Sequence, residues 1–330
     1  MKGTATGGAI SVAQGESITV SHNRFVENSG QLTTDAAPER AGAVIMLTGI
    51  NDTMVVANYV GLWDVVVDGN QLPTIIRVEY VGRDVMPFAA VQGGGANVDF
   101  ARVRASFQVD GPGGSVIIDT AMDRDLAGKL QRSDSQTFDE AAYGRVIAAM
   151  GVASRVVVTH EHADHIGGVA RFPVPERLAE RLTLSRAQFA GLASATTDGH
   201  VPEALSRAQL IDLTQPTRVA PGVVMIPAPG HTPGSAMFYV RLSDGREVLF
   251  IGDIAWAMSN ITTPATRPRF ISQFFLKTED RAAVANQVRA LHDLSAIEPG
   301  LTIVPAHDAR YIDSLVTKGL FVPTFVVEAP

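Results

Sequence analysis

The chain of 330 residues contains no cysteine. Disulfide bonds, thiolate metal sites and cysteine nucleophiles are therefore excluded, and any metal ion must be held by nitrogen and oxygen ligands. No apolar run approaches the roughly 20 residues that a membrane-spanning helix needs, and residues 1–8 lack the apolar segment of a signal peptide. We therefore expect a soluble protein with no membrane span, cytoplasmic from the chain as given and periplasmic if a leader was removed.

Positive charge is also scarce. The chain has 27 Lys and Arg against 34 Asp and Glu, which gives a formal net charge of −7. Binding to nucleic acid needs a basic surface that neutralises phosphates, so we expect no nucleic-acid partner, and a polyanionic substrate is disfavoured. The hydrophobic fraction of 46% and charged fraction of 18% are those of an ordinary globular protein. With nucleic acid disfavoured, we expect the partner to be a small-molecule substrate.

The most informative segment is a dense polar block that follows an apolar, β-branched run. Residues 156–159 read Val-Val-Val-Thr, and residues 160–165 then read His-Glu-His-Ala-Asp-His. The three histidines and the aspartate of this block lie too close together for one tetrahedral ion to use them all, which predicts two adjacent divalent metal ions. Chance would produce such a block on the order of 10⁻⁴ to 10⁻³ times in a chain with this few histidines.

Three further candidate ligands also follow predicted strands. They are His231 in Ala-Pro-Gly-His-Thr-Pro-Gly, Asp253 in Phe-Ile-Gly-Asp, and His307 in Val-Pro-Ala-His-Asp. Loops at the ends of strands in α/β sheets are where ligands bind, so we expect these residues to meet the histidine block.

The chain divides into two parts by pattern. Residues 1–74 contain short β segments, with a hairpin signal between residues 44–47 and 54–57 and a further strand at 62–67. They contain no ligand cluster, so we predict a β-rich N-terminal extension that packs on the core. Residues 75–330 show strands and helices twice in a similar order, which predicts an α/β domain of two packed sheets with helices outside. Its expected strands are 115–119, 155–159, 223–226, 236–242, 247–251 and 301–304, and its expected helices begin near residues 137, 175, 284 and 312. A capping box at residues 137–140 is predicted to open the first helix, and Ser185 to cap a helix over 186–193. Apolar residues at helical spacing, among them Val146 and Val284, mark the faces that two of these helices should bury.

The ligand-bearing segments in this order resemble those of the metallo-β-lactamase superfamily, over about residues 75–330. The resemblance implies an αββα sandwich of two mixed β-sheets flanked by helices, with a metal site at one edge. It also implies that His160, His162 and His231 bind a first ion, that Asp164, His165 and His307 bind a second, and that Asp253 bridges both. A ligand set with a bridging carboxylate is similar to the glyoxalase II and lactonase-type branches.

Two divalent ions, two aspartates and a bridging hydroxide leave a cluster near +1, which can stabilise an anionic transition state. Water on such ions titrates near pH 7, so no serine or cysteine nucleophile is needed. We therefore predict a dinuclear metal-dependent hydrolase that uses a metal-bridging hydroxide to cleave an ester or lactone-type acyl bond, with Asp164 and Asp253 as catalytic residues. Zinc is the first expectation, with manganese, iron and cobalt as alternatives. A homodimer is left open.

Several alternatives share these ligands. Phosphotriester, thioester and β-lactam hydrolases use the same site, and a mononuclear iron persulfide dioxygenase is a less favoured reading. Flavodiiron proteins usually have a carboxylate where His162 stands, and no flavin domain is evident. A nuclease is opposed by the acidic balance, and a non-catalytic binding module would normally lose ligands.

Other residues receive more modest interpretations. The resemblance suggests that Asp119 orients the histidine block, and a turn-capping role fits its sequence context equally well. Glu161 is expected to be solvated, residues 93–95 to form a loop that can act as a lid, and three remaining histidines to be structural or solvated, with His200 within reach of a substrate. These three histidines are His22, His200 and His292. Four aromatic residues follow Asp253 and fit either an acyl pocket or, more often, core packing: Trp256, Phe270, Phe274 and Phe275.

Overall fold

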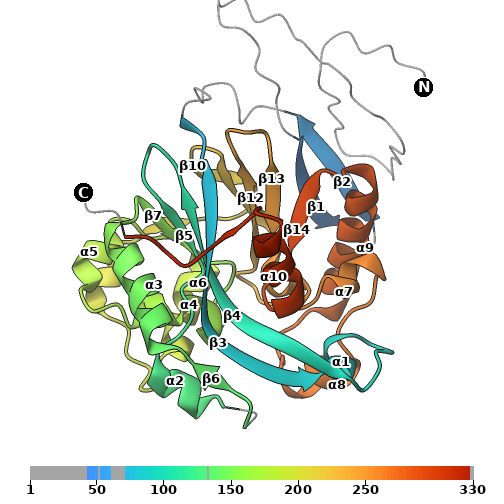
Figure 1. The fold of residues 1–330 in the computed structure, drawn as a ribbon, viewed down its shortest axis with the longest axis horizontal. Helices are drawn as coiled ribbons and strands as arrows, with labels where there is room; N and C mark the ends of the chain where they lie inside the picture. The colour runs from blue at the N-terminus through green and yellow to red at the C-terminus, as the bar shows by residue number, and fades with distance from the viewer. Residues whose placement is uncertain (1–42, 51–52, 61–70, 132–133, 328–330) are drawn as a thin grey trace, which may run out of the picture.

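The structure, a computed structural model, describes residues 43–50, 53–60, 71–131 and 134–327. Two mixed β-sheets pack face to face, and helices cover the outer face of each (Figure 1). The predicted αββα sandwich is therefore confirmed. Among the residues that the structure describes, no helix is long and apolar enough to cross a bilayer.

The first sheet has the order β15-β3-β4-β5-β7, with β6 paired to β3. The strands β3 and β4 form a long antiparallel hairpin, whereas β5 and β7 pair in parallel. Its bounds are β3 (Ile75–Pro87), β4 (Asp99–Asp110), β5 (Val116–Ile118), β6 (Thr137–Phe138), β7 (Arg155–Val157) and β15 (Val322–Pro323).

The second sheet has the order β10-β11-β12-β13-β14 and is antiparallel except for the parallel pair β13 and β14. Its bounds are β10 (Thr217–Ala220), β11 (Val223–Pro227), β12 (Ala236–Arg241), β13 (Glu247–Phe250) and β14 (Leu301–Val304). A separate short parallel pair joins β8 (Thr183–Ser185) to β9 (Gln209–Ile211).

The helices α1 to α5 come after strands of the first sheet, α6 follows β8, and α7 to α10 come after strands of the second sheet. They are α1 (Phe88–Val91), α2 (Arg124–Lys129), α3 (Glu140–Val152), α4 (Ala163–Ala170), α5 (Pro175–Ala179), α6 (Arg186–Gly191), α7 (Ser259–Thr262), α8 (Arg269–Phe274), α9 (Arg281–Ile297) and α10 (Ala309–Thr317). Short 3₁₀ turns add η2 (Leu192–Ala195), η3 (Glu203–Arg207) and η4 (Gly252–Ile254). In Figure 1, α3 and α5 lie on one side of the sandwich, and α7 and α9 on the other.

The core lies between the sheets because alternate residues of each strand point inward. Val103, Ala105 and Phe107 of β4 are buried in the same cluster as Phe238 and Phe250 of the second sheet. The rings of Phe107 and Phe250 are 4.5 Å apart between centroids. Separate apolar clusters bury the inner faces of α3 and α9 against the outside of each sheet, as the spacing of Val146 and Val284 predicts.

One predicted helix start is wrong. The capping box expected at residues 137–140 does not form, because Thr137 and Phe138 are taken up in β6, which pairs with β3. Asp139 caps α3 instead, and its carboxylate accepts a hydrogen bond of 2.9 Å from the backbone N–H of Ala142. The cap predicted at Ser185 is confirmed and forms a reciprocal capping box with Gln188.

The hairpin predicted in the N-terminal part is confirmed, since β1 (Ala43–Ile50) pairs antiparallel with β2 (Thr53–Val60). The strand predicted at residues 62–67 lies outside the described residues, as does His22. The division of the chain near residue 75 stays a prediction.

Candidate metal centre

The seven side chains singled out in the sequence lie together at one edge of the sandwich. His160, His162, Asp164 and His165 follow β7, and His162 occupies the N-cap position of α4. The other three come from the second sheet: His231 follows β11, Asp253 follows β13 and His307 follows β14. The two halves of the fold therefore contribute to one site, because β7, β13 and β14 end at the same edge.

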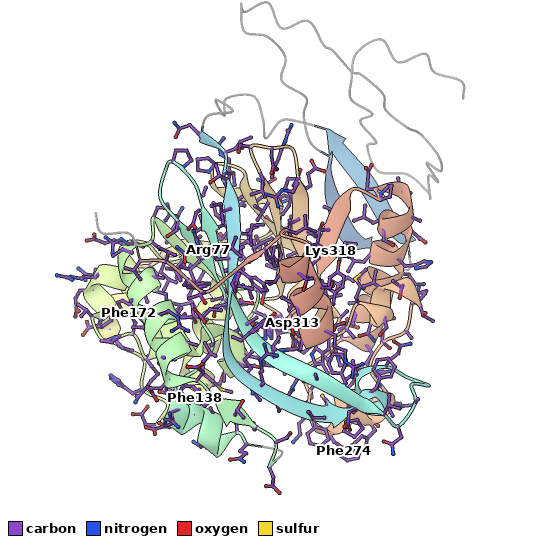
Figure 2. All side chains as sticks on the ribbon, in the orientation of Figure 1. Arg77, Phe138, Phe172, Phe274, Asp313 and Lys318 are labelled. Carbon is purple, nitrogen blue, oxygen red and sulfur yellow. The ribbon has the colours of Figure 1, made fainter. Side chains whose placement is uncertain are left out.

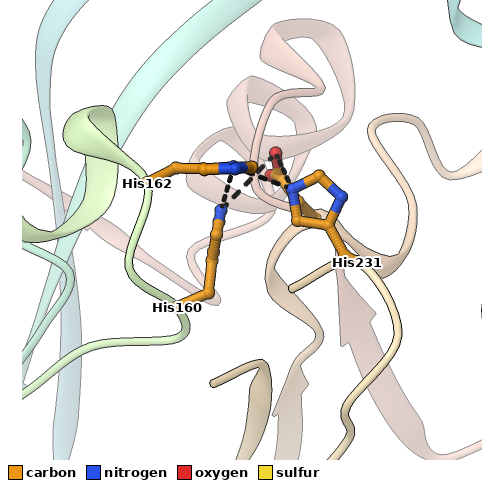
Figure 3. Close-up of side chains that lie close together, drawn as sticks. His160, His162 and His231 are labelled. Carbon is orange, nitrogen blue, oxygen red and sulfur yellow. Dashed lines mark hydrogen bonds and ion pairs between the residues drawn. The ribbon is translucent and has the colours of Figure 1, made fainter. Parts of the chain in front are cut away.

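The first group consists of His160, His162, His231 and Asp253, whose ligand atoms all lie within 4.8 Å of one another. The Nδ1 of His162 lies 3.1 Å from Nε2 of His160 and 3.0 Å from Nε2 of His231. Figure 3 shows these three rings pointing toward one another. The ligand atoms of a tetrahedral zinc ion, each about 2.0–2.1 Å from the metal, are about 3.3 Å apart, so this spacing suits one ion.

The second group consists of Asp164, His165 and His307. Nε2 of His307 lies 3.8 Å from Oδ2 of Asp164, and Nε2 of His165 lies 3.9 Å from Oδ1 of the same carboxylate. Both imidazoles also approach Oδ1 of Asp253, at 3.0 Å for His307 and 3.5 Å for His165.

Asp253 stands between the two groups. Its Oδ1 faces His165 and His307, whereas its Oδ2 lies 3.4 Å from Nε2 of His231 and 3.9 Å from Nε2 of His160. One carboxylate thus offers one oxygen to each group. Such an arrangement suits two cations that share a ligand.

The donor set fits divalent cations for a second reason, which is the direction of the lone pairs. Nδ1–H of His307 donates to the carbonyl oxygen of Val103 at 2.7 Å, so Nε2 of the neutral ring carries a lone pair. That lone pair faces Oδ1 of Asp253, which is another acceptor. The Oδ1 atom of Asp253 and Nε2 of His165 are buried without a hydrogen-bond partner, at a cost that a cation between them would remove.

Burial keeps most of these rings neutral. Burial lowers the pKa of His231 to about 4, against the opposing effects of Glu279 and Asp253, and lowers the pKa of His160 well below its usual range, against that of Asp253. Neutral imidazoles offer the lone pairs that metal ions need. His165 differs, because burial is outweighed there by Asp119, Asp253 and Asp164, which raise the pKa of His165 well above its usual range. The site therefore stabilises positive charge at this position.

Asp119 and Thr159 contact the Nδ1 atoms of two histidines in the block, on the side of each ring opposite its Nε2. Asp119 accepts a hydrogen bond of 2.6 Å from the backbone N–H of Thr159 and one of 2.9 Å from Nδ1 of His165. The hydroxyl of Thr159 lies 3.1 Å from Nδ1 of His160. Asp119 has a φ of 62°, in the left-handed region, where a non-glycine residue is strained. Asp119 was expected either to orient the histidine block or to cap a turn, and its contact with His165 agrees with the first role.

The expectation that Glu161 is solvated is wrong. Its carboxylate accepts hydrogen bonds from the hydroxyl of Thr232 at 2.8 Å and from the backbone N–H of Gly234 at 3.1 Å. These contacts tie the loop of His160 and His162 to the loop of His231. The partners are more than 70 residues away, so no local pattern indicates them.

The aromatic residues near Asp253 divide into two kinds. Trp256 is 6% exposed, and its indole N–H donates a hydrogen bond of 2.8 Å to Oδ2 of Asp253. Phe270, Phe274 and Phe275 are instead 58%, 64% and 58% exposed and contact one another at the surface, where Figure 2 shows Phe274 at the periphery. The favoured expectation of core packing is therefore wrong for these three phenylalanines.

Two buried charged residues beside the cluster, Glu279 and Arg267, are not predicted from the sequence. The carboxylate of Glu279 is 1% exposed, lies 3.0 Å from Nδ1 of His231 and accepts a hydrogen bond from the guanidinium of Arg267. Burial acts to raise the pKa of Glu279, but His231, Arg267 and Ser272 together lower it to about 2. Glu279 stands in a loop without any motif, and its only sequence signal is that it precedes Asp280, the N-cap of α9.

The remaining candidates are away from the cluster. His200 is exposed, and Nδ1 of His292 lies 2.8 Å from the carbonyl oxygen of Ile261, a structural contact. The backbone N–H of Gly93 donates to the carbonyl oxygen of Thr266 at 2.8 Å, which attaches the loop of residues 93–95 to the segment before α8. The lid role of that loop stays a prediction.

Comparison with known proteins adds a family and a fold. The model of the metallo-beta-lactamase superfamily matches residues 101–307. Probable metallo-hydrolases of Mycobacterium tuberculosis and Mycobacterium bovis are each 29% identical over 178 residues, which cover 46% of this chain and 54% of theirs. The chain thus spans about half the length of the curated relatives it matches.

Solved structures of similar fold include a quorum-quenching N-acyl homoserine lactone lactonase, with a TM-score of 0.55 and 15% identity over 74% of this chain and 95% of that one. An N-acyl homoserine lactone hydrolase with N-hexanoyl-L-homoserine at its catalytic metal centre has a TM-score of 0.56 and 15% identity, over 74% and 96% of the two chains. At this identity the likeness concerns the fold alone.

Proposed function

The chain belongs to the metallo-beta-lactamase superfamily, and we propose that it is a dinuclear metal-dependent hydrolase that cleaves the acyl bond of an ester or lactone. The observation that carries the proposal is the placement of Asp253, whose two carboxylate oxygens face two separate groups of ligand atoms. A mononuclear site would need only one of these groups.

We assign the first ion to His160, His162 and His231, the second to Asp164, His165 and His307, and a bridging position to Asp253. When bound, two divalent ions supply positive charge that brings the pKa of a water molecule near 7 and stabilises negative charge on the acyl oxygen. Zinc is our first choice, and manganese, iron or cobalt are compatible with nitrogen and oxygen ligands.

The two aspartates have different surroundings and therefore different roles. The side chain of Asp253 is buried and held by the indole of Trp256, which suits a carboxylate that keeps both groups in register. Its position between the groups also suits it to take up a proton released there and to pass it to the leaving group. The side chain of Asp164 is 23% exposed, and only Asp164 and His162 among the proposed ligands are not fully buried, so both border the space open to a substrate.

The lactone or ester substrate rests on weaker support than the metal site. The solved structures of similar fold act on N-acyl homoserine lactones, but they share only the fold with this chain. Phosphotriesters, thioesters and β-lactams contain bonds that the same site can attack, so they belong in the same test. An iron persulfide dioxygenase is the alternative from another class.

The test combines metal analysis of the purified protein with a panel of lactone, thioester, phosphotriester and β-lactam substrates. We expect two divalent ions per chain, turnover of a lactone or ester, and loss of turnover after exhaustive chelation and in Asp164→Ala. Undiminished turnover in either case would contradict the proposal. One iron per chain, with oxygen uptake on glutathione persulfide, would favour the dioxygenase.

Two proposals concern the whole chain. We propose that residues 1–74 form an extension that packs on a hydrolase domain of residues 75–330, and we leave a homodimer open. Limited proteolysis followed by metal analysis of the larger fragment tests the first proposal, and sedimentation equilibrium tests the second. A fragment of residues 75–330 that binds no metal would contradict an independent hydrolase domain.

A further inference from the structure

Behind His231 lies a buried group of charged and polar side chains that supplies no proposed ligand. Its centre is the carboxylate of Glu279, in the loop between α8 and α9. Oε1 accepts a hydrogen bond of 2.6 Å from the hydroxyl of Ser272, and Oε2 accepts from Arg267 and lies 3.0 Å from Nδ1 of His231. Glutamate is almost never fully buried unless it is paired, and this one is 1% exposed and has three partners.

The proton positions in this group follow from what each partner can donate. Arg281 donates a hydrogen bond of 2.7 Å to the hydroxyl oxygen of Ser272, so the hydroxyl proton of Ser272 is free to point at Glu279. Arg267 has only donors, and its Nη2 lies 3.3 Å from Nδ1 of His231, a longer contact than the 3.0 Å from that nitrogen to Oε2 of Glu279. An ionised carboxylate has only acceptors, so Nδ1 of His231 must carry a proton to bond Glu279. His231 is thereby the Nδ1–H tautomer, and its Nε2 lone pair faces His162 and Asp253.

Arg267 extends the group to a second proposed ligand. Its guanidinium is as buried as Glu279, and Nη1 donates a hydrogen bond of 2.7 Å to the backbone carbonyl oxygen of Asp253. The neighbouring backbone is also tied, because the N–H of Asp280 donates to the carbonyl oxygen of Gly230 at 2.7 Å. Residues 267–281 therefore contact the loops of His231 and Asp253 together.

We propose that Glu279 is a positioning residue for the first ion: it holds the ring of His231 with Nε2 directed at the other three ligand atoms, and Arg267 keeps it charged and in place. The inference rests on the proposed metal site. Carboxylates behind ligating histidines fix the tautomer and orientation of the ring, and their loss typically weakens metal binding about 10- to 100-fold.

A matched pair of substitutions tests the proposal. Glu279→Gln keeps the shape of the side chain but removes its negative charge, and its amide has one acceptor oxygen for Arg267, Ser272 and Nδ1–H of His231, where Glu279 has two. Glu79→Gln makes the same change in a buried carboxylate of β3 that is remote from the ligands and accepts from Arg145 at 2.8 and 2.9 Å and from the backbone N–H of Phe325. Both variants remove the charge of a buried carboxylate that pairs with an arginine, although Arg145 is 37% exposed and Arg267 only 1%, and only the first touches His231.

The readout is metal binding by the full chain, measured by titrating metal-free protein with zinc against a competing chelator and with cobalt by visible absorption. We expect Glu279→Gln to weaken one of two ions about 10- to 100-fold and to change the cobalt spectrum, and Glu79→Gln to leave both affinities within about twofold. Glu279→Asp, which keeps the charge, should recover part of the loss and serves if Glu279→Gln does not fold.

Three outcomes overturn the inference. Wild-type affinity and cobalt spectrum in Glu279→Gln would show that Glu279 does not position His231. Equal losses in Glu279→Gln and Glu79→Gln would assign the effect to general destabilisation. Wild-type protein that binds no divalent ion would contradict the proposed function as well, whereas failure to find a substrate would leave this inference untouched.

Discussion

The indole N–H of Trp256 donates a 2.8 Å hydrogen bond to Oδ2 of Asp253, the carboxylate that stands between the two groups of ligand atoms. The ring of Trp256 also lies 5.0 Å from the guanidinium carbon of Arg267 and has its centroid 6.1 Å from that of His307. Trp256 thus packs against three residues of the site and holds the one that joins both groups.

Replacing Trp256 tests the importance of this contact. We expect Trp256→Phe to lower turnover about 10- to 100-fold, because loss of a hydrogen bond to a charged group costs about 1.5–3 kcal/mol. The matched control is Tyr80→Phe, which removes a 3.0 Å hydrogen bond to the carboxylate of Asp313 away from the site and should leave turnover unchanged. Steady-state kinetics with metal analysis provide the measurement, and equal turnover in both variants would contradict the prediction.

Asp253→Asn tests the bridging role itself. An amide offers one weak oxygen ligand in place of two charged ones, so the two groups lose their shared ligand. Positive charge near the reacting oxygen is worth several kcal/mol, so we expect turnover to fall at least about 100-fold and metal content to fall below two ions per chain. An Asp253→Asn variant that keeps two ions per chain and wild-type turnover would contradict the prediction.

Gly234 lies where the two ligand loops meet. A Cβ at this position would stand 2.4 Å from Oε2 of Glu161 and 2.8 Å from Cγ of Gln188. We therefore expect Gly234→Ala to destabilise the protein by about 1–3 kcal/mol and to weaken metal binding, because Glu161 must release the loop of His231. Urea unfolding and zinc titration measure the two effects.

The control for that substitution is Gly144→Ala in α3, where no atom beyond the adjacent residues and the nearby helix backbone lies within 4 Å of the added carbon. Alanine is preferred to glycine inside a helix, so this variant should be as stable as the wild type or up to about 1 kcal/mol more stable. A Gly234→Ala variant that matches it in stability and in metal affinity would show that the loops tolerate separation.

A buried carboxylate beside the site predicts acid sensitivity. Asp84 accepts from Arg102 at 2.8 Å and from Arg104 at 3.0 Å, and although burial opposes it, these arginines lower the pKa of Asp84 below its usual range. The folded pKa is thus below the unfolded one. The stabilisation is present above the unfolded pKa near 3.9 and is lost as pH falls through the folded pKa.

We therefore expect Asp84→Asn to cost about 3 kcal/mol at pH 7, since the variant leaves two arginines without their buried partner. Below pH 4 the wild type should approach the variant in stability, because Asp84 becomes protonated. Urea unfolding at pH 7 and pH 3 provides the comparison. A stability difference that is the same at both pH values would contradict a lowered pKa of Asp84 in the native state.

The seven proposed ligands were visible in the sequence because each follows a β-branched apolar run. Such a run forms a buried strand, and strands of a layered fold end at a common edge, so His160, His231, Asp253 and His307 were expected to meet. The capping box at Thr137 was misjudged because pairing with β3, a long-range interaction, took those residues into a strand. Strand pairing over a long sequence separation overrides the local signal for a helix start.

The sequence alone determined the sandwich and the candidate ligands, because both depend on patterns that repeat within a few residues. Only the tertiary structure decided what holds the ligands in place. Glu161 and Gly234 are 73 residues apart, and His231 and Glu279 are 48 apart. Contacts at such separations arise when the two halves of the fold pack together, and a single glutamate in a loop has no periodicity or spacing that would indicate its partner.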